Sequence, residues 1–124
     1  MLNYAVVFVG GGIGAALRYG LSGGVYRFLG ADFPYGTLFV NATGCFLIGF
    51  LMTFFDERFS VQPALRVFLT IGVLGGFTTF STFSYETLAL LKEGSYFWGA
   101  ANVVSSVLIC LGGCWIGAVI GKLF

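Results

Sequence analysis

Residues 75–84 read GGFTTFSTFS and lie inside an apolar segment that is long enough to cross a lipid bilayer. The two adjacent glycines, Gly75 and Gly76, favour a break in the helix. Hydroxyl and aromatic side chains follow them immediately. Inside a bilayer, a broken backbone and a row of hydroxyl groups are tolerated only where they face protein or a water-filled path. The stretch therefore predicts a transmembrane helix that is broken near its middle and lines a permeation pathway.

The composition is that of an integral membrane protein. Of the 124 residues, 58% are hydrophobic and 9% are charged, whereas a soluble domain carries roughly a quarter charged residues. We expect no cleavable signal peptide, because no basic region precedes the first apolar run, which continues past a signal's length. The net charge of +1 argues against a nucleic-acid partner.

The residues on which most enzymes and metal sites depend are scarce. The chain contains no histidine, which removes the usual general base and the commonest metal ligand. Because no convincing pair of nucleophile and base exists, we predict that the protein is not an enzyme. The three cysteines, Cys45, Cys110 and Cys114, lie in apolar segments and are expected to be small buried side chains rather than a disulfide or a zinc site.

Four apolar segments are candidates for membrane-spanning helices, and they fill residues 1–124 as a single domain. They comprise residues 4–21, with an extension to residue 29 allowed by the pattern, and residues 37–55, 64–91 and 97–123. The connections between them are short and rich in turn residues. The predicted fold class is therefore all-α and integral to the lipid bilayer, with four transmembrane helices per chain.

Glycines recur at four-residue spacing in these segments. The pairs are Gly10 and Gly14, Gly20 and Gly24, and Gly113 and Gly117. Small residues at this interval let helices approach closely where lipid gives no hydrophobic drive to associate. We therefore expect tight helix packing at most of these glycines.

Positively charged residues are divided almost evenly between the two membrane surfaces. With four spans, one side holds Arg58, Arg66 and Lys122, and the other holds Arg27 and Lys92, with Arg18 near its helix end. Orientation in the membrane follows an asymmetry in these charges. The near balance permits insertion in both orientations, and hence an antiparallel homodimer. The alternative is that so few charges simply give a weak signal.

Polar side chains within the spans are functional candidates, because burying them in a membrane is costly. Asn41 could donate to an anion or tie two helices together. Arg18 could extend to the membrane surface or line a vestibule that attracts anions. Glu86 shares a helix face with Thr79 and Thr82. It could be a proton-coupling site, a cation site or an acceptor for a hydroxyl of another helix.

Two aromatic rings and a weakly polar stripe complete the candidates. Phe80 and Phe83 project from similar faces and alternate with hydroxyl residues. They are either core packing or ring edges offered to a small anion. Asn102, Ser106 and Cys110 recur every fourth residue, which fits either helix packing or a wall facing the hydroxyls of the third segment.

The sequence resembles the fluoride channel family, Fluc, also called CrcB, over its whole length. Three segments carry the resemblance: residues 36–41 (GTLFVN) for the second helix, residues 75–84 with Glu86 for the third, and residues 17–19 (LRY) for the first. The resemblance implies an antiparallel, dual-topology homodimer with two parallel pores. Such a channel would let fluoride leave a prokaryotic cytoplasm passively across the plasma membrane.

The resemblance also implies where fluoride would pass. Phe80 and Phe83 would form an aromatic box around the ion, with rings from both subunits, and Asn41 would donate to fluoride near them. Ser106 would lie on a polar track beside this box, and Arg18 would shape a vestibule. The rest of the track would comprise Thr82 and the neighbouring hydroxyls of Ser81 and Ser84.

A structural sodium ion, which is not transported, is a further implication of the resemblance. Backbone carbonyls of Gly75 and Thr78 from each subunit would bind it at the break in the third helix. One departure from the family pattern is Cys110, at a position where serine is expected in several members. A thiol is a weaker donor than a hydroxyl.

Two other classes of function remain open on the sequence. A proton-coupled exporter of the small dual-topology kind would have to use Glu86, because the first apolar segment contains no carboxylate. A membrane scaffold is the other class. It has no need of hydroxyl groups beside a helix break and is less well supported.

Overall fold

The computed structural model describes residues 1–58 and 60–124, and over these residues it contains helices and no strand. Its elements are α1 (Leu2–Leu29), α2 (Tyr35–Asp56), α3 (Pro63–Val67), the π-helix η1 (Phe68–Leu74), α4 (Gly75–Phe77), α5 (Phe80–Lys92) and α6 (Tyr96–Leu123). Four helical segments are long and apolar enough to span a membrane, and the third, Pro63–Lys92, combines α3 to α5. The four predicted spans are confirmed, and the first extends to Leu29.

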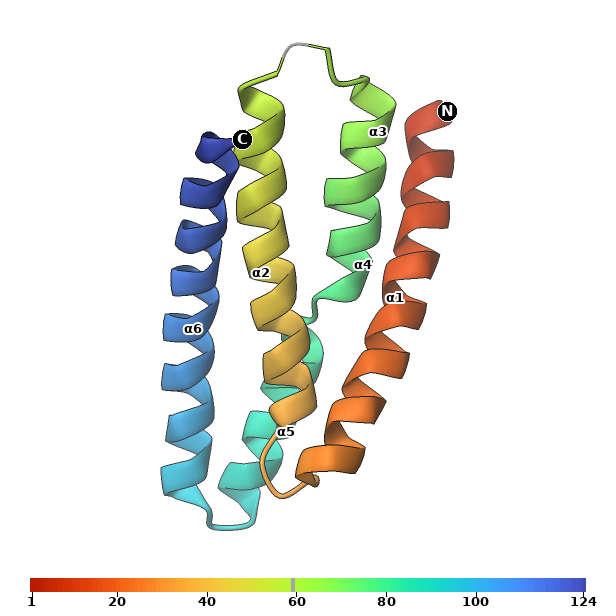
Figure 1. Cartoon of the computed structure of the whole chain (residues 1–124). Helices are drawn as coiled ribbons and strands as arrows, with labels where there is room; N and C mark the ends of the chain where they lie inside the picture. Colours follow the sequence, from red (N-terminus) through yellow and green to blue (C-terminus); the bar gives the residue numbers. More distant parts are fainter. Residues whose placement is uncertain (59) are drawn as a thin grey trace.

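The four spans run alternately down and up the bundle (Figure 1). Both chain ends, the end of α2 and the start of α3 lie at one end, and the connections α1–α2 and α5–α6 lie at the other. This is the arrangement that four spans require. α2 and α6 run in the same direction and make the most extensive contact in the chain, while α1 packs mainly against η1 and α4.

Glycines bring the backbones of α2 and α6 into contact. A Cβ atom built on Gly49 would lie 2.1 Å from the carbonyl oxygen of Cys114, and one built on Gly117 would lie 2.1 Å from that of Phe46. No side chain fits at such distances, so each glycine is required by the close approach of the two helices. The packing predicted for Gly117 is confirmed.

The glycines of α1 fall into two groups. A Cβ atom on Gly14 would lie 2.0 Å from the carbonyl oxygen of Val73, so this predicted contact is confirmed. Gly20 and Gly24 have nothing within 4 Å of such an atom, and the packing predicted there is not made within the chain. In this half of α1 the contact with α2 is made instead by Ser22 and Tyr26, which lie against Gly36.

The third span is broken near its middle, as predicted, but the break lies beyond the glycine pair. Gly75 and Gly76 remain helical in α4, and the extended residues are Thr78 (φ −86°, ψ 157°) and Thr79 (φ −150°, ψ 120°). Extended backbone suits β-branched residues, so two threonines can make the break without help from glycine. Gly76 serves close packing instead, because a Cβ atom there would lie 2.4 Å from the carbonyl oxygen of Gly11.

The π-helix η1 forms the middle of the half-span before the break, between α3 and α4, and no sequence pattern indicated it. Such wide turns are rare and are frequently found at functional sites. η1 packs along α1, where a Cβ atom on Gly10 would lie 3.0 Å from the Cα atom of Gly72. The widened turn is thus seated on α1 directly before the broken segment.

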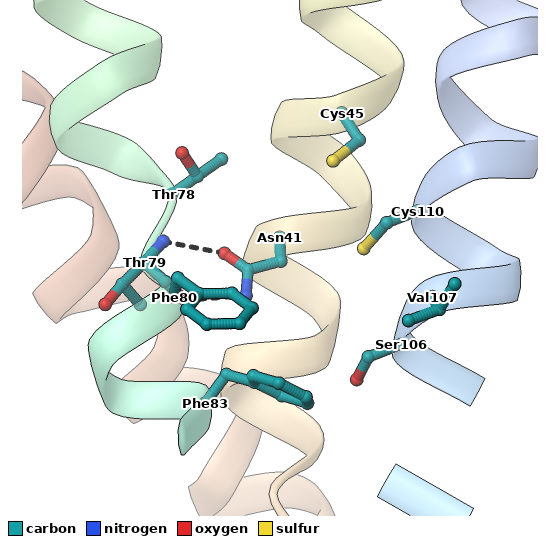
Figure 2. A pocket seen from close by; sticks show the side chains of 9 residues that line it. All are labelled: Asn41, Cys45, Thr78, Thr79, Phe80, Phe83, Ser106, Val107 and Cys110. Carbon is teal, nitrogen blue, oxygen red and sulfur yellow. Dashed lines mark hydrogen bonds between the residues drawn. The ribbon is translucent and has the colours of Figure 1, made fainter. Parts of the chain in front are cut away.

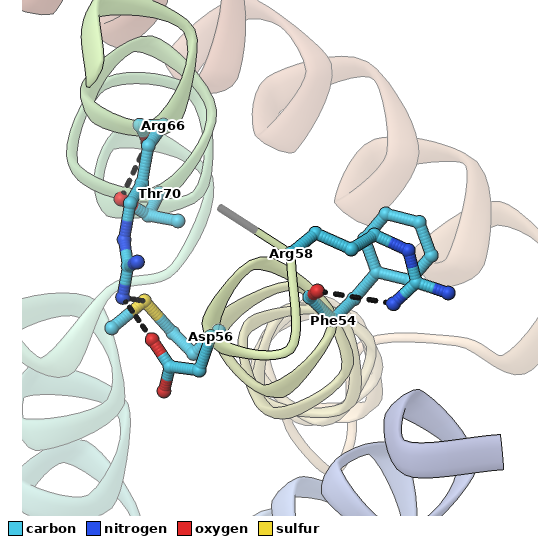
Figure 3. Close-up of polar contacts among 6 residues, drawn as sticks. Phe54, Asp56, Arg58, Arg66 and Thr70 are labelled. Atoms are coloured by element: carbon cyan, nitrogen blue, oxygen red, sulfur yellow. Dashed lines mark hydrogen bonds and ion pairs between the residues drawn. The ribbon is translucent and has the colours of Figure 1, made fainter. Parts of the chain in front are cut away.

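Surface contacts join the end of α2 to α3 (Figure 3). Arg66 Nη2 lies 2.8 Å from Asp56 Oδ1, and both side chains are partly exposed. The Arg58 guanidinium lies 3.8 Å from the centroid of the Phe54 ring, and its Nη1 donates to the Phe54 carbonyl at 3.2 Å. Exposed ion pairs contribute about 0–1 kcal/mol, so the Arg66–Asp56 pair adds little to the stability of the bundle.

We expect Gly117→Ala to destabilise the protein in detergent by about 1–3 kcal/mol, because the new methyl group would overlap the Phe46 carbonyl of α2. Gly112→Ala on the same helix is the matched control, since an added Cβ there has nothing within 4 Å. The measurement is the thermal unfolding midpoint of each purified variant. Equal midpoints for the two variants would contradict the close α2–α6 contact.

Candidate functional site

A pocket of about 270 Å³ lies beside the break in the third span, between that span, α2 and α6 (Figure 2). Its lining joins hydroxyls, an amide, two rings and two thiols. The residues are Asn41 and Cys45 from α2, Thr78, Thr79, Phe80 and Phe83 from the break and α5, and Ser106, Val107 and Cys110 from α6. Five residues predicted for the fluoride pathway or the sodium site line this pocket: Asn41, Thr78, Phe80, Phe83 and Ser106.

Asn41 binds both backbone groups of Thr79. Its Oδ1 accepts the Thr79 N–H at 2.8 Å, and its Nδ2 donates to the Thr79 carbonyl at 2.9 Å. These groups have lost their helical partners at the break and would be costly to bury unpaired in a membrane. Of the two roles considered for Asn41, tying helices together is therefore realised. The pair uses one of the two amide hydrogens, and the other is available to a further acceptor in the pocket.

Thr79 begins the second half of the broken span as the N-cap of α5. Its hydroxyl oxygen accepts the Thr82 N–H at 3.1 Å, and it lies 3.2 Å from each of the hydroxyl oxygens of Ser81 and Thr82. A helix N-terminus carries the positive end of the helix dipole, and α5 has no acidic residue in its first turn. The pocket at the break is therefore a favourable place for an anion.

Phe80 and Phe83 lie together at the pocket. Their ring centroids are 5.3 Å apart with an angle of 45° between the planes. Phe80 is 78% exposed within the single chain, whereas Phe83 is half-buried. Within the single chain the Phe80 ring is therefore not packed in the core, whereas the half-buried Phe83 ring is compatible with either alternative.

The polar stripe of α6 divides between packing and the pocket. Asn102, which is 1% exposed, donates from Nδ2 to the Thr87 hydroxyl at 2.8 Å and so ties α6 to α5. Ser106 donates to Asn102 Oδ1 at 3.3 Å and lines the pocket, as does Cys110 one turn further on. Both alternatives for the stripe are thus realised, at different positions.

Glu86 accepts hydrogen bonds from two other helices. The Tyr26 hydroxyl of α1 donates to Glu86 Oε2 at 2.5 Å, and the Thr37 hydroxyl of α2 donates to Oε1. Of the three roles considered for this carboxylate, an acceptor for hydroxyls of other helices is the one that the contacts match. Tyr26 was not predicted to be a functional residue. Its hydroxyl lies in an apolar span and needs a hydrogen-bond partner, and the carboxylate of Glu86 in another span was a candidate for that partner.

Arg18 contacts the half-span before the break. It is half-buried, and its Nε donates to the carbonyl oxygen of Gly76 at 3.2 Å. Gly76 belongs to the last turn of α4, where carbonyls lose their helical partners and the helix dipole is negative. The arginine therefore caps the half-helix before the break instead of extending to the surface.

Three predicted track residues lie outside the pocket lining. Thr82 is half-buried, and Ser81 and Ser84 are exposed on α5 within the single chain. The Ser84 hydroxyl donates to the Phe80 carbonyl at 2.9 Å, which commits its proton to its own helix. Gly75 lines a second, smaller cavity together with Thr78, on the other side of the break.

The two carbonyls predicted to bind sodium have lost their helical partners. In a continuous helix the Gly75 carbonyl would accept from the Thr79 N–H, but that N–H donates to Asn41. The Thr78 carbonyl would accept from the Thr82 N–H, which donates to the Thr79 hydroxyl instead. Neither oxygen accepts another backbone hydrogen bond in the part of the chain that the structure describes, so both can accept from, or coordinate, another group.

Comparison with known sequences matches residues 5–118 to the model of the CrcB-like protein family, described as Camphor Resistance (CrcB). The chain belongs to the CrcB-like family. The resemblance stated from the three sequence segments is thereby confirmed.

Relatives of this CrcB-like chain are highly similar to it. It is 54% identical over 114 residues to a protein of Geotalea daltonii and 50% identical over 117 residues to one of Geobacter metallireducens. These alignments cover 90% and 94% of the chain and 92% and 94% of the relatives. A protein of Methylococcus capsulatus is 47% identical over 121 residues; the alignment covers 98% of the chain but 53% of that relative's length. All three are named fluoride-specific ion channel FluC, and none is named as an enzyme.

We expect Asn41→Leu to lower the free energy of unfolding, because it leaves the N–H and carbonyl of Thr79 unpaired. Each buried group without a partner costs about 1–3 kcal/mol. Asn3→Leu makes the same change at an exposed position of α1 and serves as the control. Unfolding of both variants in detergent is the measurement. A destabilisation by Asn41→Leu no larger than that by Asn3→Leu would count against the amide pair.

Proposed function

We propose that this chain is a fluoride channel that lets fluoride leave the cytoplasm passively. The observation that carries the proposal is the pocket at a broken transmembrane span, with the N-terminus of α5 and the Asn41 amide beside it. The names of the three relatives support fluoride as the ion. The bacterial origin of those relatives supports a multi-pass position in a prokaryotic plasma membrane.

The pocket chemistry explains how a small anion could pass without being held. The free hydrogen of the Asn41 amide and the positive end of α5 replace part of the hydration that fluoride loses. The edges of the Phe80 and Phe83 rings carry partial positive charge and attract an anion weakly. Several weak contacts suit conduction better than one strong site, because the ion must also leave.

The same donors give a reason for preferring fluoride over larger halides. An amide hydrogen and ring edges attract a small anion more strongly than a large one, because its charge can approach them more closely. Thr82 precedes Phe83 on α5, and Ser106 of α6 lines the pocket together with Phe83. Their hydroxyl groups would continue the path. Arg18, which caps α4, adds positive charge near the break.

An antiparallel homodimer would complete the path. Phe80 is 78% exposed, and the hydroxyls of Ser81 and Ser84 are exposed beside it, so a membrane-facing position would be costly for this face of α5. A second copy would cover it and add its own rings. The nearly even distribution of arginine and lysine between the two ends is compatible with both orientations.

A structural sodium ion at the dimer axis would satisfy the carbonyls of Gly75 and Thr78. Each has lost its helical N–H partner, and the described residues contain no group of three or more histidine, cysteine, aspartate or glutamate side chains that could hold a metal instead. Carbonyl oxygens are ligands for hard cations. Two from each subunit would surround one ion, and its positive charge would offset the negative ends of the two α4 helices.

The test of the proposed function is fluoride efflux from liposomes that contain only the purified protein, read with a fluoride electrode. We expect trapped fluoride to leave without any proton gradient, and trapped chloride to stay. Fluoride that remains inside would refute the channel, and efflux that requires a proton gradient would favour the exporter that uses Glu86.

Phe80→Leu and Phe83→Leu are each expected to slow this efflux at least about tenfold, equivalent to ~1.4 kcal/mol, because a leucine offers no positive ring edge to the anion. Phe28→Leu is the matched control, since Phe28 is 91% exposed at the end of α1. Light scattering on each variant checks that assembly is intact. Efflux at the unmodified rate in both pocket variants would remove the aromatic contact from the mechanism.

Sodium should stabilise the assembled protein. We expect the unfolding midpoint in detergent to rise with sodium concentration. At a sodium concentration a hundred times the dissociation constant, the stabilisation should be ~2.7 kcal/mol. Light scattering should give a mass of two chains. Potassium and a large organic cation at equal ionic strength are the controls. A monomeric mass, or equal stability in all three salts, would count against a sodium-linked dimer.

A further inference from the structure

Two thiols lie in the wall of the pocket. Cys45 of α2 and Cys110 of α6 both line it, and they stand on neighbouring helices near Asn41 (Figure 2). Both side chains are half-buried, and both cysteines are free. Neither thiol has a part in the path described above.

The seam between α2 and α6 accounts for this placement. The two helices run in the same direction, and Gly49 touches the backbone of Cys114. One turn earlier on both helices stand Cys45 and Cys110, so a contact at Gly49 brings these two residues to the same level. One further turn earlier, Asn41 and Ser106 face the pocket from the same two helices.

Two thiols without a third ligand favour a particular class of metal. The described residues hold no group of three or more histidine, cysteine, aspartate or glutamate side chains, so a tetrahedral zinc site is not available at this place. Soft d¹⁰ ions bind thiolates strongly, and some of them are satisfied by two sulfur ligands in a line. Mercuric, silver and cuprous ions belong to this class.

We propose that Cys45 and Cys110 form a two-thiol site for soft metal ions, and that a metal bound there inhibits fluoride flux. The inhibition, though not the binding, rests on the proposed channel function. With mercuric chloride the reaction forms two Hg–S bonds, breaks two Hg–Cl bonds and releases two protons and two chloride ions. No electron is transferred. The bridging metal would cross the pocket wall next to Asn41 and Ser106.

Metal retention tests the site without any flux measurement. Each protein receives one equivalent of Hg²⁺, passes through a desalting column with a monothiol competitor, and is analysed for bound mercury. We expect wild type to retain the metal at least about tenfold better than Cys45→Ser or Cys110→Ser, because the second thiol binds intramolecularly. Cys114→Ser, which removes the third cysteine of the chain, should retain mercury like wild type.

Retention that survives either pocket substitution, or that is lost in Cys114→Ser, would overturn the two-thiol site. The same variants in liposomes test the inhibition, with each rate normalised to its own untreated rate. Mercuric chloride should abolish fluoride efflux in wild type and Cys114→Ser, a dithiol should restore it, and both pocket variants should resist. Efflux unaffected by bound mercury would refute the inhibition. No efflux from untreated protein would refute the channel and leave the retention result standing.

Discussion

A membrane-spanning helix cannot be broken unless the backbone groups released at the break find new partners. Here the N–H and carbonyl of Thr79 are both taken by the amide of Asn41, at 2.8 and 2.9 Å. The Thr79 hydroxyl in turn accepts the N–H of Thr82, and Arg18 donates to the carbonyl of Gly76. Most of the polar chemistry near the centre of the chain follows from this one requirement.

The break also separates charge along the third span. α4 ends with carbonyls that carry partial negative charge, and α5 begins with N–H groups that carry partial positive charge. Arg18 stands at the negative end, and the pocket with Phe80 and Phe83 stands at the positive end. A single interruption thus creates one place suited to a cation and another suited to an anion, a short distance apart in a membrane interior.

The spans and the central pocket were predictable, because both depend on local sequence. Apolar length defined four spans, and hydroxyl residues after a glycine pair indicated a broken third helix. The exact position of the break was not predictable, because the glycine pair serves another purpose: Gly76 stays helical and allows close contact with Gly11 of α1. Periodicity along one segment carries no information about such a neighbour.

Contacts across long sequence separations account for the other differences. Tyr26 and Thr37 meet at Glu86 only because α1, α2 and α5 converge at one end of the bundle. Arg18 meets the carbonyl of Gly76 for a similar reason. The local sequence around each of these residues does not indicate its partner, so the contacts could be found only from the arrangement of the helices.

The carboxylate of Glu86 needs such partners if an anion is to pass nearby. It lies six residues after Phe80 on α5, which is about 9 Å along the helix axis. An unpaired negative charge at that distance would repel fluoride in a medium of low dielectric constant. Two hydroxyl donors from α1 and α2 spread the charge, and the helix dipole and Arg18 oppose it closer to the break. The two sets of hydrogen bonds therefore have complementary effects. The hydroxyls of Tyr26 and Thr37 reduce the repulsion from the fixed charge of Glu86, and the Asn41 amide, which pairs with Thr79, keeps one N–H available to a passing anion.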